Sequence, residues 1–354
     1  MLNITKNLIK FESDKDHPKE IKKCFNYSIK LLSKSGLKVK TYSSKGKLSL
    51  VAGKKIKKHY QYILNGHLDV VPGDYKNAFK PYLKGSRLYG RGASDMKGPV
   101  GAMIKLMLNP GLKDIDLGLI LNTDEEVGGF DGANYLVNQG YTADCVIVPD
   151  GGDNFNLTLA EKGVLHLKIL AQGKSAHASR PWEGDNSLEK LFIIYEKIKR
   201  KVPDTTSSNR WLETVNLGKI SGGLAANVVP SKAEMILDFR YPKKVQRKQI
   251  LNLLKSVCQK ETGVTFKILS DGQTMNTSKN NKYIKKIIKV AKENKVSLKL
   301  NKDHGASDGR FFSAKGIPVI MFKPTCSSIH IDDEWIDLKS LEIFYRILKR
   351  FMLK

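Results

Sequence analysis

The chain contains 354 residues, 41% of them hydrophobic, and carries a formal net charge of +26 at pH 7. This length exceeds that of an average domain, so we expect two domains with a well-filled core. The longest apolar runs are interrupted within a few residues, which excludes a membrane-spanning helix of about 20 apolar residues. The N-terminus lacks the apolar region of a secretory signal, and the four cysteines are far apart in the sequence. We therefore expect a soluble, cytoplasmic protein with free thiols.

The positive charge raises the alternative of a nucleic-acid-binding protein, because such proteins neutralise phosphates. Of the 61 basic residues, however, only ten are arginines, and the lysines are spread along the whole chain. Nucleic-acid sites favour clustered arginines with stacking aromatic residues. The composition therefore does not favour nucleic acid as the partner, although the charge can steer anionic small molecules toward the protein.

Residues 1–162 have the pattern of an α/β sheet domain. Apolar residues at steps of three and four between residues 17 and 35 predict an amphipathic helix. Short apolar runs bounded by Gly, Asp and Asn predict strands, with one helical pattern between them. The strand-like runs are Leu48–Val51, Tyr60–Leu64, Asp116–Leu121 and Cys145–Val148, and the helical pattern covers Pro99–Leu108. A domain of this class places its chemistry at strand ends.

Residues 163–271 have a different order of elements, β-α-β-β-α-β, which is typical of a ferredoxin-like module. Strands are predicted to begin near Leu165, Val215, Ala233 and Val264, and helices to cover Leu188–Val202 and Ile250–Val257. Residues 272–354 then return to a helix at Tyr283–Ala291, a strand at Pro318–Phe322 and a last helix at Leu338–Met352. We therefore predict a discontinuous domain, residues 1–162 and 272–354, interrupted by the inserted module.

Two pairs of polar residues follow the predicted strands. His67 and Asp69 are two residues apart, so in an extended backbone both side chains point the same way. Asp69 can then accept a hydrogen bond from one imidazole nitrogen while the other binds a metal. Glu125 and Glu126 are adjacent and point in different directions, so one can bind a metal while the other accepts a proton from water.

Asp95, Asp150 and His330 complete a set of metal-binding side chains in loops near strand ends. Each alone fits an ordinary turn, but their joint occurrence with the two pairs above predicts a two-metal hydrolase. The glycines around Asp95 do not make a dinucleotide fingerprint, because Asp95 occupies the position of its third glycine. Likewise, Gly173–Ser175 is not a phosphate-binding loop, because Lys168 stands where that motif needs glycine.

Six segments in order carry a family resemblance: GHLDVVPG, GRGASDMKG, DEEVGG, the Asp150 loop, NVVP, and GASDGRFF followed by His330. They resemble the co-catalytic zinc amidohydrolases, a family that contains aminoacylases, acetylornithine deacetylases, succinyl-diaminopimelate desuccinylases and glutamate carboxypeptidases. The resemblance covers nearly the whole chain. It implies a zinc-exopeptidase-like mixed-sheet catalytic domain with an inserted ferredoxin-like lid or dimerisation domain.

The resemblance also implies roles for individual residues. Two zinc ions, with cobalt or manganese as substitutes, would be held by His67 and Asp150 at one site, by Glu126 and His330 at the other, and by Asp95 bridging both. Glu125 would be the general base toward a metal-bridging water, and Asp69 would orient His67.

In the inserted module, His177 matches the family's lid histidine, which reaches the active site of the partner subunit in dimers and helps to hold the oxyanion. Asn227 and Arg240 match lid positions that grip the substrate, and Ser307 would complete the carboxylate pocket. Position 304 is His where relatives commonly have Gly, which would narrow that pocket.

We therefore expect a metal-dependent hydrolase that cleaves an amide bond of an N-acyl amino acid or short peptide with a free carboxylate. It would act on this small-molecule substrate as a homodimer formed through the inserted module. A dipeptidase or carboxypeptidase of the same family is the alternative within this class. A nucleic-acid-binding protein and a metal-binding scaffold without turnover are alternatives from other classes. The presence of Glu125 together with all the expected ligands disfavours the scaffold.

Overall fold

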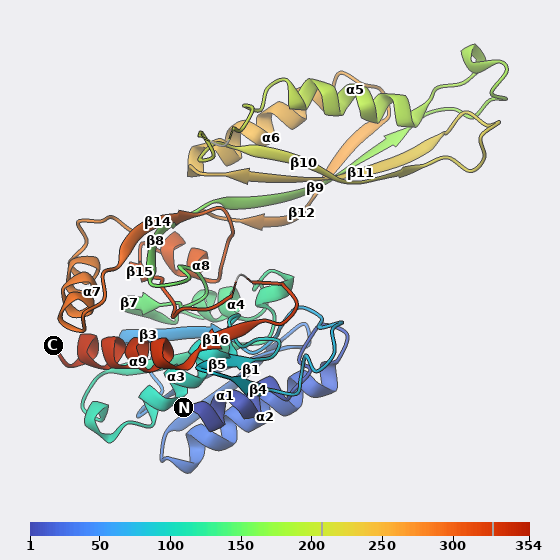
Figure 1. Ribbon diagram of the computed structural model, residues 1–354. Helices are drawn as coiled ribbons and strands as arrows, with labels where there is room; N and C mark the ends of the chain where they lie inside the picture. Colours follow the sequence, from blue (N-terminus) through green and yellow to red (C-terminus); the bar gives the residue numbers. More distant parts are fainter. Residues whose placement is uncertain (207, 328) are drawn as a thin grey trace. The chain divides into compact units, whose positions relative to one another are not determined.

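The computed structural model describes residues 1–206, 208–327 and 329–354. The chain divides into two compact units, which we describe separately (Figure 1). Unit 1 consists of Met1–Ala160, Met275–Asp303 and Ser307–Lys354, and unit 2 of Glu161–Thr274 and His304–Ala306. The sequence placed the insertion at residues 163–271 and gave no sign that His304–Ala306 also belongs to it. Among the described helices, none is both long and apolar enough to cross a membrane.

Unit 1 is built on a six-stranded sheet with the order β1-β2-β6-β3-β7-β15. Its strands are β1 (Lys38–Ser44), β2 (Lys47–Gly53), β3 (His59–His67), β6 (Leu117–Asn122), β7 (Thr142–Ile147) and β15 (Val319–Ile320). β1, β2 and β6 pair antiparallel, whereas β6, β3, β7 and β15 run parallel to one another. The carboxyl ends of the four parallel strands therefore meet at one edge of the sheet.

Helices cover both faces of this sheet. They are α1 (Leu2–Ile9), α2 (Pro18–Lys34), α3 (Lys97–Met107), α4 (Ala133–Asn138), α7 (Lys282–Glu293), α8 (Gly309–Ala314) and α9 (Leu338–Leu353), with short 3-10 turns η1 (Pro110–Leu112) and η2 (Glu125–Val127). Successive residues of β3 point to opposite faces. Leu64 packs in the cluster with α3 and α9, and Ile63 packs in the cluster with α4 and α8. Helices thus shield both faces of the sheet from water, which explains the continuous apolar runs of β3 and β6.

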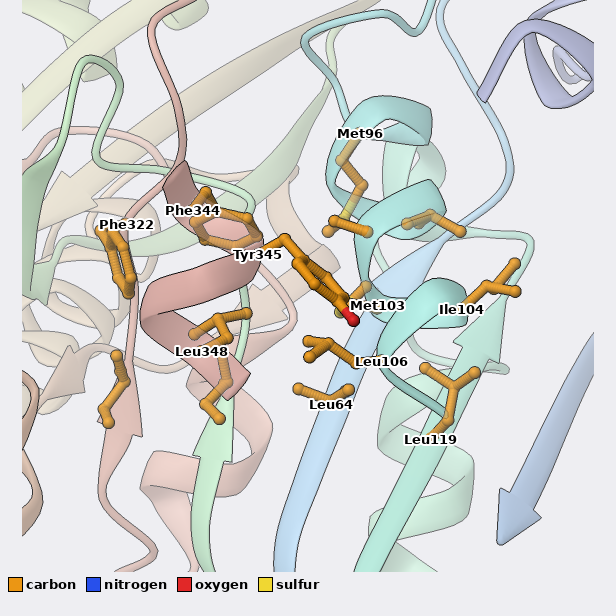
Figure 2. Close-up of a cluster of buried hydrophobic side chains, with 14 of the residues drawn as sticks. Leu64, Met96, Met103, Ile104, Leu106, Leu119, Phe322, Phe344, Tyr345 and Leu348 are labelled. Carbon is orange, nitrogen blue, oxygen red and sulfur yellow. The ribbon is translucent and has the colours of Figure 1, made fainter. Parts of the chain in front are cut away.

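Helices α3 and α9 pack together and so connect the N-terminal and C-terminal segments of unit 1. Figure 2 shows Phe344, Tyr345 and Leu348 of α9 beside Met103 and Leu106 of α3, above the sheet. Two small sheets complete unit 1: β13-β8-β14 (Met275–Asn276, Asn156–Glu161, Lys299–Asp303) and β16-β5-β4 (Trp335–Asp337, Arg87–Tyr89, Tyr82–Lys84). The C-terminal segment therefore completes the core that the N-terminal segment begins.

Unit 2 is a four-stranded antiparallel sheet with the order β10-β11-β9-β12. Along the chain it contains β9 (Gly163–Gln172), η3 (Pro181–Glu183), α5 (Ser187–Lys199), β10 (Thr214–Gly222), β11 (Lys232–Tyr241), α6 (Lys244–Cys258) and β12 (Val264–Gly272). This is the β-α-β-β-α-β order expected from the sequence. Leu165, Leu167 and Ile169 alternate along β9 and pack with Leu191 and Ile194 of α5, and α5 and α6 lie on one face of the sheet (Figure 1).

Several elements carry no clear sequence pattern. The edge strand β1 is polar and largely exposed, so it has no buried face to produce an alternating pattern. Helix α1 is short and has no side-chain cap, yet Leu8 and Ile9 are fully buried. Its formation depends on tertiary packing against α3 rather than on local signals.

The packing of α9 is testable by one buried and one exposed leucine. Leu348 is fully buried in the α3–α9 layer, so Leu348→Ala should lower the free energy of unfolding by about 2–5 kcal/mol. Leu353, at the end of the same helix, is 51% exposed, and Leu353→Ala should cost well under this amount. Urea denaturation of the two variants measures the difference. Equal losses would contradict the packing described here.

Candidate metal centre

The site forms where the parallel strands end. β3 ends at His67, which is paired in register with Asn122, the last residue of β6. The η2 turn with Glu125 and Glu126 follows β6, and Asp150 follows the end of β7. Because these three strands are parallel neighbours, their following residues emerge at the same edge of the sheet.

Two loops bring further side chains to this edge. Asp95 lies two residues before the start of α3, and the peptide bond between Asp95 and Met96 is cis. His330 lies in the loop that leads to β16 and has a left-handed backbone conformation, with φ of +62°. Its side chain is about half exposed, whereas His67 and Asp95 are buried.

The structure brings the six predicted side chains together in two groups, one of His67, Glu125 and Asp150 and the other of Asp95, Glu126 and His330. Within each group the candidate ligand atoms lie within 4.8 Å of one another. The Asp95 carboxylate connects the groups, because its Oδ1 is 3.4 Å from His67 Nε2 and its Oδ2 is 3.6 Å from His330 Nε2. His67 Nε2 is also 3.6 Å from Asp150 Oδ1, and His330 Nε2 is 3.3 Å from Glu126 Oε2.

The atoms that face one another here fit metal ions. His67 Nε2, Asp95 Oδ1 and Glu126 Oε1 are buried and have no hydrogen-bond partner among the described residues. Buried polar atoms are normally paired, so orphaned acceptors gathered at one place indicate a missing partner. Imidazole nitrogens and carboxylate oxygens are ligands typical of zinc. The described residues therefore fit two divalent ions, one for each group.

The charges of the two groups also indicate a need for cations. Burial, and then repulsion by Asp150, raise the pKa of Glu125 well above its usual value. Burial and repulsion by Asp95 likewise raise the pKa of Asp150 and of Glu126. Burial lowers the pKa of His67, but contacts with Asp150, Asp69 and Asp95 outweigh burial and raise it well above the usual value. Bound cations would remove the repulsion among these carboxylates.

Asp69 supports the site through contacts with two residues, His67 and Glu126. The His67 Nδ1 atom is 2.9 Å from the main-chain oxygen of Asp69 and 3.5 Å from its carboxylate Oδ1. The other carboxylate oxygen, Oδ2, accepts a hydrogen bond of 3.0 Å from the main-chain N–H of Glu126. The shortest contact that orients the imidazole thus comes from the backbone, whereas the side chain also fixes the η2 turn. Both contacts of the Nδ1 atom direct His67 Nε2 toward the two ligand groups.

Contacts of Arg310 and Asp308 also stabilise the region of the Glu125–Glu126 turn, and the sequence analysis did not predict these two residues. The Arg310 guanidinium donates to the carbonyl oxygens of Gly128 (2.6 Å) and Ser307 (2.9 Å). Beside it, the buried Asp308 accepts from Asn122 Nδ2 at 2.7 Å, and burial and repulsion by Asp124 raise its pKa to about 8. The motif GASDGRFF was recognised in the sequence, but its resemblance did not assign a role to Asp308 or Arg310.

Glu334 was also missed, and it holds the loop of Asp95. Its fully buried carboxylate accepts hydrogen bonds from Arg91 Nη1 (2.9 Å) and from the backbone N–H groups of Gly92 (2.8 Å), Ser94 (2.6 Å) and Asp95 (2.8 Å). Its main-chain oxygen accepts from Gly90 N–H. Glu334 thus ties the Asp95 loop to the segment that carries His330. Nothing in the sequence distinguishes it from the neighbouring Asp332 and Asp333.

A buried lysine adds a positive charge at the Asp150 side. Lys323 is fully buried, and its ammonium lies 3.2 Å from Asp153 Oδ1. Burial lowers the pKa of Lys323, but the carboxylates of Asp95 and Asp153 outweigh burial and raise it. The ammonium is therefore charged. Burial raises the pKa of Asp95, but Lys323 and the contacts with His67 together outweigh burial and hold the pKa of that carboxyl below its usual value. Lys323 follows a strand-like run and carries no sequence signal of this role.

A third group of metal-ligand side chains, Glu12, Asp14 and His17, precedes α2. Here Asp14 Oδ1 is 2.8 Å from His17 Nδ1 and accepts from the Asp16 N–H at 2.9 Å. These contacts satisfy the group within the protein, as in an ordinary turn before a helix.

The remaining predicted residues have defined surroundings of their own. In unit 2, the exposed His177 accepts a hydrogen bond at Nδ1 from the Ser179 N–H at 3.2 Å, and its strand-like segment pairs with Val228, next to Asn227. Arg240 donates through Nε (2.8 Å) and Nη2 (3.1 Å) to Asp238. In unit 1, Ser307 is buried and its Oγ accepts from the Gly309 N–H at 3.2 Å. Their roles toward a substrate stay predictions.

Comparisons with known proteins agree with this geometry. A family model described as Peptidase family M20/M25/M40 matches residues 63–354. Succinyl-diaminopimelate desuccinylase of Helicobacter pylori (strain HPAG1) is 31% identical over 302 residues, which cover 80% of this chain and 77% of that protein. Aminoacylase-1 of Sus scrofa is 28% identical over 321 residues, covering 81% of this chain and 78% of that protein.

Solved structures show the same fold. An M20 family metallo-carboxypeptidase from Sulfolobus solfataricus superposes with a TM-score of 0.82 at 20% identity, covering 99% of this chain and 98% of that chain. A tripeptidase from Staphylococcus aureus gives a TM-score of 0.81 at 20% identity, covering 100% of this chain and 98% of that chain. The α/β fold class expected from the sequence is confirmed. The match over residues 63–354 and the desuccinylase relatives show that the chain belongs to peptidase family M20/M25/M40, a family of metal-dependent hydrolases.

Proposed function

We propose that this protein is a dizinc hydrolase that cleaves the amide bond of an N-acyl amino acid or short peptide with a free carboxylate. The observation that carries the proposal is the buried Asp95 carboxylate, whose two oxygens face His67 and His330 in separate ligand groups. A carboxylate shared in this way is what a two-metal site needs at its centre. The names of the desuccinylase and aminoacylase relatives support N-acyl amino acids as the substrate class.

In this proposal, His67 and Asp150 hold one ion, Glu126 and His330 hold the other, and Asp95 is shared. When bound, two zinc ions supply Lewis acidity toward the scissile carbonyl and acidify a water molecule. Cobalt or manganese would substitute in vitro, because the donors are mixed imidazole and carboxylate.

Glu125 is the general base of the proposed reaction. Glu125 belongs to the group of His67 and Asp150. Its buried surroundings raise its pKa, so its carboxylate binds a proton more readily than an exposed carboxylate does. A carboxylate with a raised pKa accepts the proton of the attacking water and delivers it to the leaving amine nitrogen. Asp69 positions both His67 and the turn that carries Glu125 and Glu126 through the contacts described above.

Unit 2 carries three residues that are proposed to contact the substrate, namely His177, Asn227 and Arg240. Because the Ser179 N–H donates to Nδ1 of His177, the neutral ring carries its proton on Nε2 and can donate it to a developing oxyanion. Asn227 lies on the segment beside His177, and Arg240 offers a guanidinium for a carboxylate. Ser307, which belongs to unit 1, is also proposed to bind a carboxylate of the substrate. We propose that the protein is a homodimer in which unit 2 of one subunit serves the site of its partner.

A screen of N-acetyl amino acids, succinyl-diaminopimelate and dipeptides, each with zinc, cobalt or manganese supplied to apo-protein, tests the function. Release of amino acid from the acylated compounds supports a deacylase. Cleavage of dipeptides alone would instead support the exopeptidase alternative, which the metallo-carboxypeptidase and tripeptidase structures keep open at the level of fold. No turnover with any metal would contradict both.

Replacement of the proposed base separates metal binding from proton transfer. Glu125→Gln keeps the size of the side chain but cannot accept the proton, so kcat should fall about 100- to 10,000-fold while both metals are retained. Glu126→Ala should lose metal as well as activity, because it removes a ligand. Metal analysis by mass spectrometry and steady-state kinetics measure the two effects. Full activity of Glu125→Gln would remove Glu125 from the mechanism.

Glu334→Gln tests the support of the Asp95 loop. An amide NH₂ would face backbone N–H groups where the carboxylate now accepts from four donors, so metal affinity should fall about tenfold or more. Metal retained after dialysis against a chelator measures this. Glu342→Gln is the control, because Glu342 is a surface partner of Lys105 at 3.2 Å. Equal metal retention in the two variants would contradict the role of Glu334.

Mixed dimers test whether sites are shared between subunits. His177→Ala and Glu125→Ala should each be inactive alone. If His177 acts across the dimer, a heterodimer of the two variants contains one site with both groups, and it should recover up to about half of the wild-type activity per site pair. Absence of recovery in heterodimers isolated with two affinity tags would show that each subunit uses its own His177.

A further inference from the structure

Lys323 is a fully buried lysine of unit 1, and the proposed reaction does not use it. It lies three residues after β15. Its main-chain N–H donates to the carbonyl oxygen of Gly152 at 3.1 Å, and its own carbonyl oxygen accepts from the Phe155 N–H at 2.9 Å. Both partners lie in the segment that follows Asp150, so Lys323 is bonded on both sides to the loop of this proposed metal ligand.

The loop and the segment of Lys323 are packed closely. A Cβ atom added to Gly152, which has φ of +77°, would lie 2.1 Å from the carbonyl oxygen of Asn156 and 2.9 Å from the Cα atom of Phe322. Glycine is the residue that allows two backbones to approach in this way. The backbone of Lys323 is therefore held by the fold itself.

The ammonium of Lys323 has an incomplete set of partners. Asp153 Oδ1, at 3.2 Å, is within ion-pair distance, and the Asp153 side chain is 32% exposed. The ammonium nevertheless has no hydrogen-bond partner among the described residues. An ammonium has three donors, and a buried charge is costly unless charges of opposite sign compensate it. The contact with Asp153 alone therefore does not account for the burial of this cation.

The remaining compensation comes from the metal centre. Burial lowers the pKa of Lys323, but the carboxylate of Asp95, followed by Asp153 and then by Asp150, contributes to raising it. Conversely, Lys323 is the largest of the interactions that lower the pKa of Asp95 against the effect of burial. Two proposed metal ligands, Asp95 and Asp150, thus share the charge of Lys323 with Asp153.

This charge has opposite effects on the two states of the site. The ligand groups contain four carboxylates, Asp95, Glu125, Glu126 and Asp150, which repel one another when no metal is bound. A nearby ammonium reduces that repulsion. The same ammonium repels a divalent ion at Asp95 and Asp150, because like charges interact strongly in poorly hydrated surroundings.

We propose that Lys323 is an internal counter-ion of the metal centre, which stabilises the metal-free fold of unit 1 and weakens the binding of divalent ions at Asp95 and Asp150. The proposal rests on the two-metal site proposed above, but not on the reaction that the site performs. It requires no contact between Lys323 and a substrate.

Lys323→Met tests the proposal, because Met is also long and unbranched but has no charge. In protein stripped of metal at pH 8, Tm should fall by about 2 °C or more, because the carboxylates lose their counter-ion. Zinc affinity, measured by competition with a chromophoric chelator, should rise about tenfold or more, because the repulsion is lost. Damage to the packing alone would lower Tm and zinc affinity together.

Lys57→Met is the control for the loss of one positive charge. The Lys57 ammonium is 2.9 Å from Asp116 Oδ2 at the surface. Asp116 directly precedes β6, whereas the turn with Glu125 and Glu126 follows the other end of this strand. Screening by water should keep the zinc affinity of Lys57→Met within about twofold of the wild type.

Asp153→Asn provides a second test, which leaves the buried lysine in place. This variant removes the closest carboxylate and keeps the ammonium, so the less compensated charge of Lys323 should weaken zinc binding about threefold or more. Unchanged zinc affinity in this variant would contradict the proposal. The variant also decides the matter if Lys323→Met does not fold even with zinc.

The outcomes distinguish this proposal from the proposed function. A lower Tm and tighter zinc binding of Lys323→Met, without turnover of any acylated amino acid or peptide by the wild type, would support the counter-ion and contradict the function. Zinc affinity of Lys323→Met equal to or below that of the wild type would overturn the counter-ion, whatever the enzyme cleaves. Absence of zinc binding by the wild type would overturn both.

Discussion

The buried Asp95 carboxylate lies between two imidazoles, and distant parts of unit 1 hold the loop that carries it. A carboxylate cannot be both buried and crowded by other acids unless its backbone is held firmly and its charge is balanced. Glu334 provides the first condition through its bonds to the Asp95 loop. Lys323 contributes to the second through its positive charge. The protein itself thus holds Asp95 in place and balances part of its charge, apart from any metal that the site binds.

The ligands come from several segments of the chain. Three parallel strands bring His67, the Glu125–Glu126 turn and Asp150 to one edge of the sheet. The four carboxylates of the two ligand groups come from three separate parts of the chain, and each raises the pKa of its neighbours when they are buried together. Long-range contacts such as that between Arg310 and Gly128 are needed to hold each loop against its neighbours.

Much of this could be predicted from the sequence. Buried strands produce continuous apolar runs, and polar residues after such runs pointed to His67, Glu126 and Asp150. The stabilising residues could not be found in this way, because Glu334 resembles any acid in a polar loop, and its burial appears only when the chain is folded. For the same reason, the sequence did not show that His304–Ala306 packs with unit 2. Local sequence patterns reveal which residues are buried, but not which loops that are distant in the sequence contact each other.

The division of unit 1 among three stretches of chain has a consequence for synthesis on the ribosome. Unit 2 is nearly continuous in sequence, and its sheet is complete once β12 has emerged at Gly272. Unit 1 must wait for α9 to cover α3, and His330 and Glu334 follow the strands of unit 2 along the chain. Until then, its acidic residues lack both the loop and the helix that organise them. Nascent chains therefore carry a finished insertion on an unfinished host until α9 has emerged.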